Sequence, residues 1–225
     1  MATALLGMTL ALAAVDWAAA EKNWRRLHYF FKPAALLAMI AWFSVAAGWG
    51  RANLWFGLAL VFSLLGDINL LFPERLFLPG LASFLLAHVL YIVGFNQAPL
   101  VLQAPQALAV LALAAGAFGF VFGRLWSGLA HIAGGRRMLL PVIFYSVTIS
   151  LMVVSAWLCL FRPAWPLNAA LAAGLGALLF FCSDSLLAYN RFVKQTAHHD
   201  LLVMSAYHLG QIGIIAGVIL AAANG

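Results

Sequence analysis

The stretch NLWFGLALVFSLLGDINLLF, residues 53–72, decides the fold, because it is long and apolar enough to cross a bilayer and yet contains one acid, Asp67. A membrane-spanning helix needs about 20 mainly apolar residues. An ionised carboxylate that faces lipid is costly, so such groups normally face the interior of a helix bundle or a wet cavity. The stretch therefore predicts a membrane helix bundle with a buried polar site.

The composition of the whole chain agrees with this prediction. The 225 residues are 66% hydrophobic and only 8% charged, whereas a soluble domain carries roughly 25% charged residues. The net charge of +6 comes from twelve Lys and Arg spread along the chain. In a membrane protein such residues determine topology, so we expect no nucleic-acid partner.

Eight apolar segments are long enough to span a bilayer. They are residues 2–19, 30–48, 53–72, 76–95, 104–123, 138–160, 166–188 and 201–221. The connections between them are short and leave no room for a separate soluble domain. The sequence therefore predicts a single all-α transmembrane domain of eight helices over residues 1–225.

The positive charges favour one orientation of these spans. The connections after spans one, three, five and seven carry Lys22, Arg25, Arg26, Arg75, Arg124, Arg136, Arg137, Arg191 and Lys194, whereas the remaining connections carry only Arg51 and Arg162. The positive-inside rule places the basic side in the cytoplasm. Both termini are then expected on the non-cytoplasmic side.

A second acid, Asp184, lies in the apolar stretch LLFFCSDSLLAYN, residues 178–190. Like Asp67, it is expected about one turn from the cytoplasmic end of its span. Polar residues on four further spans fall in the same half of the membrane: Lys32, Ser83, His88, Tyr91, Tyr145, Thr148, Tyr207, His208 and Gln211. This convergence predicts a polar pocket that opens to the cytoplasmic leaflet and is shared by the two acids.

Each of these residues also has a structural interpretation. Asp67 and Asp184 could be interfacial acids paired with nearby arginines. His88, His208 and Tyr145 could be hydrogen-bonding residues of helix packing, and Lys32 could anchor its span at the interface. Asp16, at the end of the first span, is expected at the interface. His28 is expected to be solvated.

A weak internal repeat adds a further expectation. SLLGDINLL in span three resembles FFCSDSLLA in span seven, and each is followed by a span with a histidine, His88 or His208. Two four-helix halves related by duplication would bring Asp67 and Asp184 together.

Two carboxylates in an apolar pocket are suited to acid–base chemistry. One can stay protonated while the other is ionised, which provides a general acid and a general base for breaking an acid-labile C–O bond. No Gly-x-Ser-x-Gly or His-Glu-x-x-His motif is present.

Several motifs, in their order and spacing, resemble those of the YhhN family of membrane lysoplasmalogenases. They are FKP (31–33), SLLGD (63–67), GLASFLLAHVLYIVGF (80–95), LLFFCSDSLLAYNRF (178–192) and MSAYHLGQ (204–211), together with the tyrosine-bearing sixth span. The resemblance implies an eight-span hydrolase that cleaves the vinyl ether bond of lysoplasmalogens to a fatty aldehyde and a glycerophospho-alcohol.

By the same resemblance, Asp67 and Asp184 would be catalytic. The expected substrate-binding residues are Lys32, His88, Tyr91, Tyr145, Ser183, Asn190, Tyr207 and Gln211. No metal or organic cofactor is expected. The lysophospholipid would enter from the inner leaflet of a bacterial inner membrane, with its phosphate near Lys32, Arg191 or Lys194 at the cytoplasmic rim.

Two other function classes remain open from the sequence. In a proton-coupled transporter, the same acids would relay protons across the membrane. In a haem or metal protein, His88 and His208 would be ligands.

Overall fold

The computed structural model describes residues 1–101, residues 135–224 and scattered positions between 105 and 123. The regular elements of these residues are helices: α1 (Ala2–Glu21), α2 (Arg25–Ala46), α3 (Leu54–Leu70), α4 (Pro73–Phe95), α6 (Gly135–Trp157), the 3-10 helix η1 (Leu158–Phe161), α7 (Leu167–Phe192) and α8 (His199–Ala222). The prediction of an all-α bundle is confirmed for this part of the chain.

The structure also bears on the predicted number of membrane spans. Among the described residues, six helices are long and apolar enough to cross a membrane, whereas α3 has only 17 residues. At about 1.5 Å per residue, α3 is about 26 Å long, slightly less than a hydrocarbon core of about 30 Å. The predicted fifth span, residues 104–123, is described only at interrupted positions, which are helical. Eight spans are therefore not confirmed.

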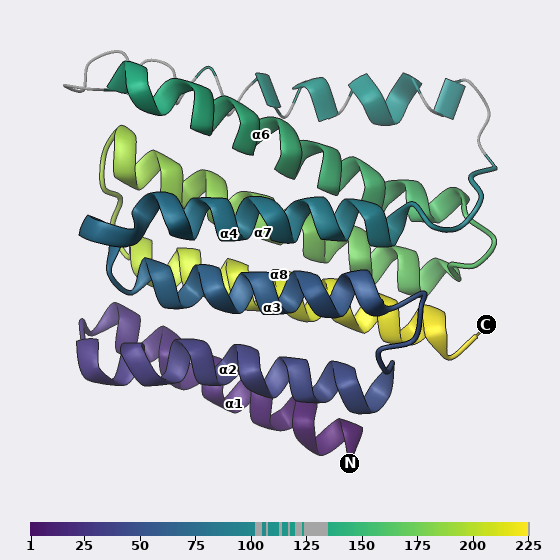
Figure 1. The fold of residues 1–225 in the computed structure, drawn as a ribbon, viewed down its shortest axis with the longest axis horizontal. Helices are drawn as coiled ribbons and strands as arrows, with labels where there is room; N and C mark the ends of the chain where they lie inside the picture. Colours follow the sequence, from purple (N-terminus) through teal and green to yellow (C-terminus); the bar gives the residue numbers. More distant parts are fainter. Residues whose placement is uncertain are drawn as a thin grey trace.

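The helices run side by side along the long axis of the molecule (Figure 1). Helix α1 packs on α2, α3 on α4, and α7 on α8, while α6 contacts both α4 and α7. The turns that join these three pairs lie together at the left end in Figure 1, and the two chain ends lie toward the right. The Lys- and Arg-rich connections after α1, α3 and α7 thus share one end of the bundle, which we call the basic end.

Small residues bring α7 and α8 into close contact. A Cβ atom on Gly176 would lie 2.4 Å from the backbone nitrogen of Ile214, and one on Gly210 would lie 2.7 Å from the nitrogen of Phe180. Close backbone approach through glycine is typical of helix pairs in membranes. It fixes α7, which carries Asp184, against α8, which carries Tyr207.

Helix α4 bends near its start. Leu76 has non-helical backbone angles (φ −115°, ψ 19°), and Pro79 follows three residues later. Proline lacks an N–H and its ring clashes with the carbonyl four residues before it, so the bend has a direct cause. Phe77 and Leu81, which follow Leu76 on α4, line the cavity described below.

Candidate active site

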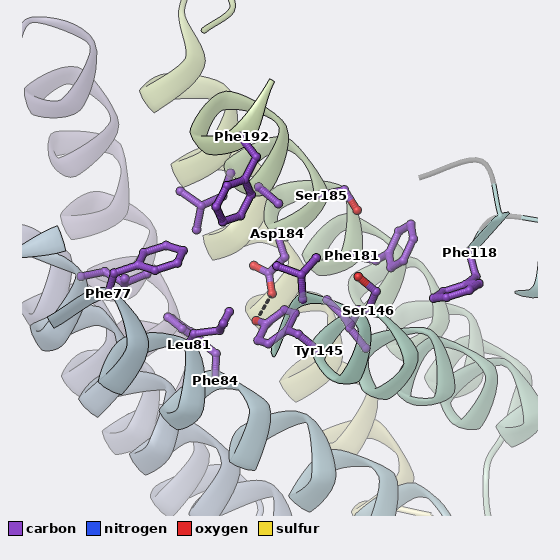
Figure 2. A pocket seen from close by; sticks show the side chains of 15 residues that line it. Phe77, Leu81, Phe84, Phe118, Tyr145, Ser146, Phe181, Asp184, Ser185 and Phe192 are labelled. Carbon is purple, nitrogen blue, oxygen red and sulfur yellow. Dashed lines mark hydrogen bonds between the residues drawn. The ribbon is translucent and has the colours of Figure 1, made fainter. Parts of the chain in front are cut away.

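Asp184 lies at the centre of a hydrogen-bonded cluster from three helices. Its Oδ2 atom accepts a hydrogen bond from the Tyr145 hydroxyl of α6 (Figure 2) and lies 3.1 Å from Nε2 of His88 on α4. His88 Nε2 is also 3.0 Å from the Tyr145 oxygen. Because the tyrosine proton points to Asp184, this network assigns the histidine proton to Nε2. The cluster brings together residues that are 96 and 39 positions apart from Asp184.

Asp184 and Tyr145 lie on the wall of an apolar cavity of about 50 Å³. Its lining is Leu70, Phe77, Leu81, Phe84, Phe118, Val142, Tyr145, Ser146, Ile149, Phe181, Asp184, Ser185, Leu187, Ala188 and Phe192 (Figure 2). A water needs about 10–15 Å³ of such space. The cavity therefore has room for a few waters, and a lipid would have to separate its side chains.

The cavity lies toward the basic end of the bundle. Its lining includes Phe192, at the last position of α7, and Phe77, in the second turn of α4. The Arg191 guanidinium lies over the Phe77 ring, 4.8 Å from its centroid. A positive charge therefore stands beside an aromatic residue of the cavity wall.

Asp67 has a different set of partners. Its Oδ1 atom is 3.3 Å from Nζ of Lys32, and its Oδ2 atom accepts a 2.8 Å hydrogen bond from the Tyr207 hydroxyl. All three side chains are buried. A buried carboxylate of this kind is tolerated only with such partners. Asp67 is not among the residues that line the cavity beside Asp184.

Three aromatic rings pack between the two clusters. The rings of Phe84, Phe180 and Tyr207 contact one another, with centroids 5.3–6.1 Å apart. Tyr207 bonds Asp67, and Phe180 contacts His88, which bonds Asp184. The two acids thus belong to separate polar clusters joined by an aromatic contact. Their joint action as an acid–base pair stays a prediction.

A third contact completes a band of polar groups across the interior. The Tyr91 hydroxyl of α4 donates a 2.5 Å hydrogen bond to Oε1 of Gln211 on α8. Tyr91 is one turn from His88, and Gln211 is one turn from Tyr207. The band takes residues from α2, α3, α4, α6, α7 and α8, the helices that correspond to the six spans on which the sequence showed polar groups.

Other expected substrate-binding residues have structural partners instead. Ser183 donates to the Val203 carbonyl of α8, and the Asn190 side chain accepts two hydrogen bonds from Thr196 in the loop after α7. Lys32 is only 3% exposed and paired with Asp67. It is therefore not a rim residue that could meet a phosphate, contrary to the sequence-based expectation, because the carboxylate draws it into the interior.

The two histidines of the haem or metal alternative have different partners. His88 bonds Tyr145 and Asp184, whereas Nδ1 of His208 accepts a 3.0 Å hydrogen bond from the Trp17 indole. Within the described ranges, no group of three His, Cys, Asp or Glu side chains is placed to hold a metal ion.

Sequence reasoning missed one buried acid. Asp16 is fully buried and its Oδ1 atom lies 2.9 Å from Nδ1 of His28. The predicted spans ended at residue 19 and resumed at residue 30, which placed both residues near water. In the structure α1 continues to Glu21 and α2 begins at Arg25, so both side chains are helical and face each other. The lone acid in an apolar first span was the signal that could have identified them.

Comparisons with known proteins identify relatives of this chain. The chain is 34% identical over 180 residues to human "Lysoplasmalogenase TMEM86B", an alignment that covers 80% of this chain and 69% of the human protein. It is 30% identical over 199 residues to "Lysoplasmalogenase" of Mycobacterium bovis, covering 84% and 71%. The pig TMEM86B protein is 34% identical over 160 residues, and only 61% of its length is covered.

No solved structure matches the chain significantly. The model of the YhhN family matches residues 27–218, which include Lys32, both acids and all their polar partners in the two clusters. The chain therefore belongs to the YhhN family.

Proposed function

We propose that the chain is a membrane hydrolase that cleaves the vinyl ether bond of lysoplasmalogens, releasing a fatty aldehyde and a glycerophospho-alcohol. The observation that carries this proposal is the Asp184 carboxylate on the wall of an apolar cavity, bonded to Tyr145 and near His88. A proton donor beside an apolar chamber suits a substrate whose reactive bond joins directly to an alkyl chain. The names of the relatives support the same reaction class.

Asp184 is the better candidate for the acid that protonates the substrate. A vinyl ether hydrolyses when its β-carbon receives a proton, which leaves an oxocarbenium ion on the carbon bonded to oxygen. Water then adds to give a hemiacetal, which collapses to the aldehyde and the alcohol. Both contacts of Asp184 use Oδ2, so the proton is placed on Oδ1. The Tyr145 hydroxyl and the His88 N–H hold the carboxyl in place.

Asp67 is the better candidate for the ionised acid. Lys32 lies 3.3 Å from its carboxylate, and an adjacent cation favours the charged form of an acid. Its negative charge would stabilise the oxocarbenium ion electrostatically, across the contact between Phe84 and Tyr207. The Tyr207 hydroxyl, held by Asp67, would orient the attacking water. This assignment keeps both acids in the reaction but gives them different roles.

The lipid would enter from the basic end, which the positive-inside rule assigns to the cytoplasm. The alkyl chain would displace apolar side chains of the cavity wall. Arg191, over Phe77, is then a cation beside the cavity that could meet a lysolipid phosphate. We propose that the protein lies in a bacterial inner membrane, with eight spans and both termini on the non-cytoplasmic side.

The contacts also support two duplicated halves. Asp67 of α3 takes partners from α2 and α8, and Asp184 of α7 takes partners from α6 and α4. Exchanging α2, α3 and α4 with α6, α7 and α8 converts one cluster into the other. Such an exchange is what a duplication of a four-helix unit produces.

The test is a substrate panel for the purified protein. It compares a vinyl-ether lysolipid with its saturated-ether and ester analogues, and follows the release of aldehyde and of fatty acid. We expect aldehyde from the vinyl ether alone, and none from Asp184→Asn, while Ser185→Ala on the same cavity wall serves as a matched control. Fatty acid from the ester would make the protein a lysophospholipase, and transport of solute without any product would favour a transporter.

A further inference from the structure

A third polar cluster lies outside the two described above. It joins Asp16 and Trp17 of α1, His28 of α2 and His208 of α8 through the contacts Asp16–His28 and Trp17–His208. Asp16 and His208 are 0% exposed. The proposed reaction does not use these residues, and burying a carboxylate and an imidazole without a role is unfavourable.

Two atoms of this cluster lack a partner. Among the described residues, Oδ2 of Asp16 and Nε2 of His208 are buried without any hydrogen-bond partner. His208 accepts the Trp17 indole proton at Nδ1, so a neutral imidazole carries its own proton at Nε2. One atom is thus an unused acceptor and the other an unused donor. A buried water can accept from the imidazole and donate to the carboxylate at the same time, and buried waters commonly satisfy polar groups of this kind.

The cluster contacts the Asp67 site through α8. The ring centroids of His208 and Tyr207 lie 5.1 Å apart, and the Tyr207 hydroxyl donates to Asp67. Oδ1 of Asp67, which faces Lys32, is a further buried oxygen without a hydrogen bond among the described residues. The cluster therefore borders the proposed catalytic machinery.

The other side of the cluster reaches a polar hollow at the basic end. This hollow has a volume of about 260 Å³, room for many waters. Its lining is Ala19, Ala20, Asn23, Arg25, His28, Tyr29, Leu70, Leu71, Pro73 and Asp200. His28 thus touches the hollow on one side and Asp16 on the other. The apolar cavity beside Asp184 shares only Leu70 with this hollow.

We propose that Asp16, His28 and His208 form a hydrated inlet that supplies water and relays protons from this hollow to the Lys32–Asp67 pair, separately from the route of the lipid. The inlet rests on the proposed hydrolysis, which consumes one water per bond cleaved. The water oxygen becomes the aldehyde oxygen, one of its hydrogens balances the proton given to the β-carbon, and the other ends on the released alcohol. An apolar cavity filled by an alkyl chain has no space for that water. The water therefore needs an entrance separate from that of the lipid.

The inlet residues act through Asp67 and are positioning residues. Asp16→Asn keeps the size of the side chain but removes its ability to accept and return a proton. We expect kcat to fall about tenfold or more with KM changed less than twofold, which is within the range of a lost proton-transfer group. The solvent deuterium isotope effect on kcat should rise, and added imidazole or formate should restore part of the rate. His28→Gln should lower kcat and raise the solvent isotope effect in the same way.

Asp200→Asn is the matched control. Asp200 lines the same hollow, but its side chain is 63% exposed and lies outside the inlet, so its kcat and isotope effect should match those of the unmodified protein. Unchanged kcat and isotope effect in Asp16→Asn would overturn the inlet. A lower rate with an unchanged isotope effect and no rescue would show a structural role and would overturn it as well.

A second measurement does not depend on turnover. Hydroxyl radicals generated by X-rays modify side chains next to bound water, so His208 should be labelled in the unmodified protein despite its complete burial, and less so in Asp16→Asn. Unlabelled His208 would refute the hydrated inlet even if aldehyde is released. Labelled His208 without aldehyde release from any lipid would leave the inlet in place and reject the proposed reaction.

Discussion

Replacing one member of the buried Lys32–Asp67 pair should destabilise the protein more than replacing both. The two charged groups lie 3.3 Å apart. With an effective dielectric constant of about 20, Coulomb's law gives 332/(20 × 3.3), or about 5 kcal/mol, for their attraction. Removing one partner of a buried pair typically costs about 3–5 kcal/mol, because the other charge stays buried alone. Lys32→Met or Asp67→Asn alone should therefore each lower the free energy of unfolding by an amount in that range.

The double variant Lys32→Met/Asp67→Asn should recover much of this loss, since no isolated charge remains. The assay is reversible unfolding in mixed detergent micelles, followed by tryptophan fluorescence, for the four members of the double-mutant cycle. Lys22→Met removes an exposed cation and should change the free energy by less than about 0.5 kcal/mol. If the loss in the double variant equals the sum of the two single losses to within about 0.5 kcal/mol, the two side chains do not interact as described.

Three further predictions concern the other cluster and the helix packing. Tyr145→Phe removes the hydroxyl that donates to Asp184. Because this hydrogen bond would stabilise the carboxylate that forms when Asp184 gives up its proton, the loss should lower kcat about 10–100-fold, the equivalent of about 1.5–3 kcal/mol for a hydrogen bond to a charged group, as measured by aldehyde release. Ser146→Ala, on the same cavity wall, should leave kcat within about twofold, a change of less than about 0.5 kcal/mol. Gly176→Ala should lower the unfolding temperature because its Cβ would meet the α8 backbone at 2.4 Å, whereas Gly7→Ala, with nothing within 4 Å, should not.

Much of the bundle could be predicted from the sequence, since apolar length and the placement of Lys and Arg are strong signals in a membrane protein. The convergence of polar residues followed from the same argument, because the direction of each span fixes which residues share a depth. His88 and Asp184 are a clear case: they were assigned to the same half of the membrane and they hydrogen-bond each other.

The partners of each acid could not be predicted in the same way. Depth along a span does not give the rotation of a helix, so the sequence could not show that Lys32 turns inward to Asp67 or that Ser183 turns toward the α8 backbone. Asp16 was misplaced for another reason. Hydropathy marks where a segment leaves the lipid, but α1 and α2 continue as helices beyond that point, and the extra turns bury its side chain.

The two acids also differ in what surrounds them, and this difference bears on the reaction. Asp67 has a cation as a partner and is not among the residues that line the apolar cavity, whereas Asp184 contacts a tyrosine hydroxyl and a histidine ring and lies on the cavity wall. If the two halves arose by duplication, as we propose, identical partners would have given two equivalent carboxylates. In the proposed reaction, the lysine beside Asp67 and the tyrosine beside Asp184 would give the two acids the different roles that protonation of a vinyl ether followed by attack of water requires.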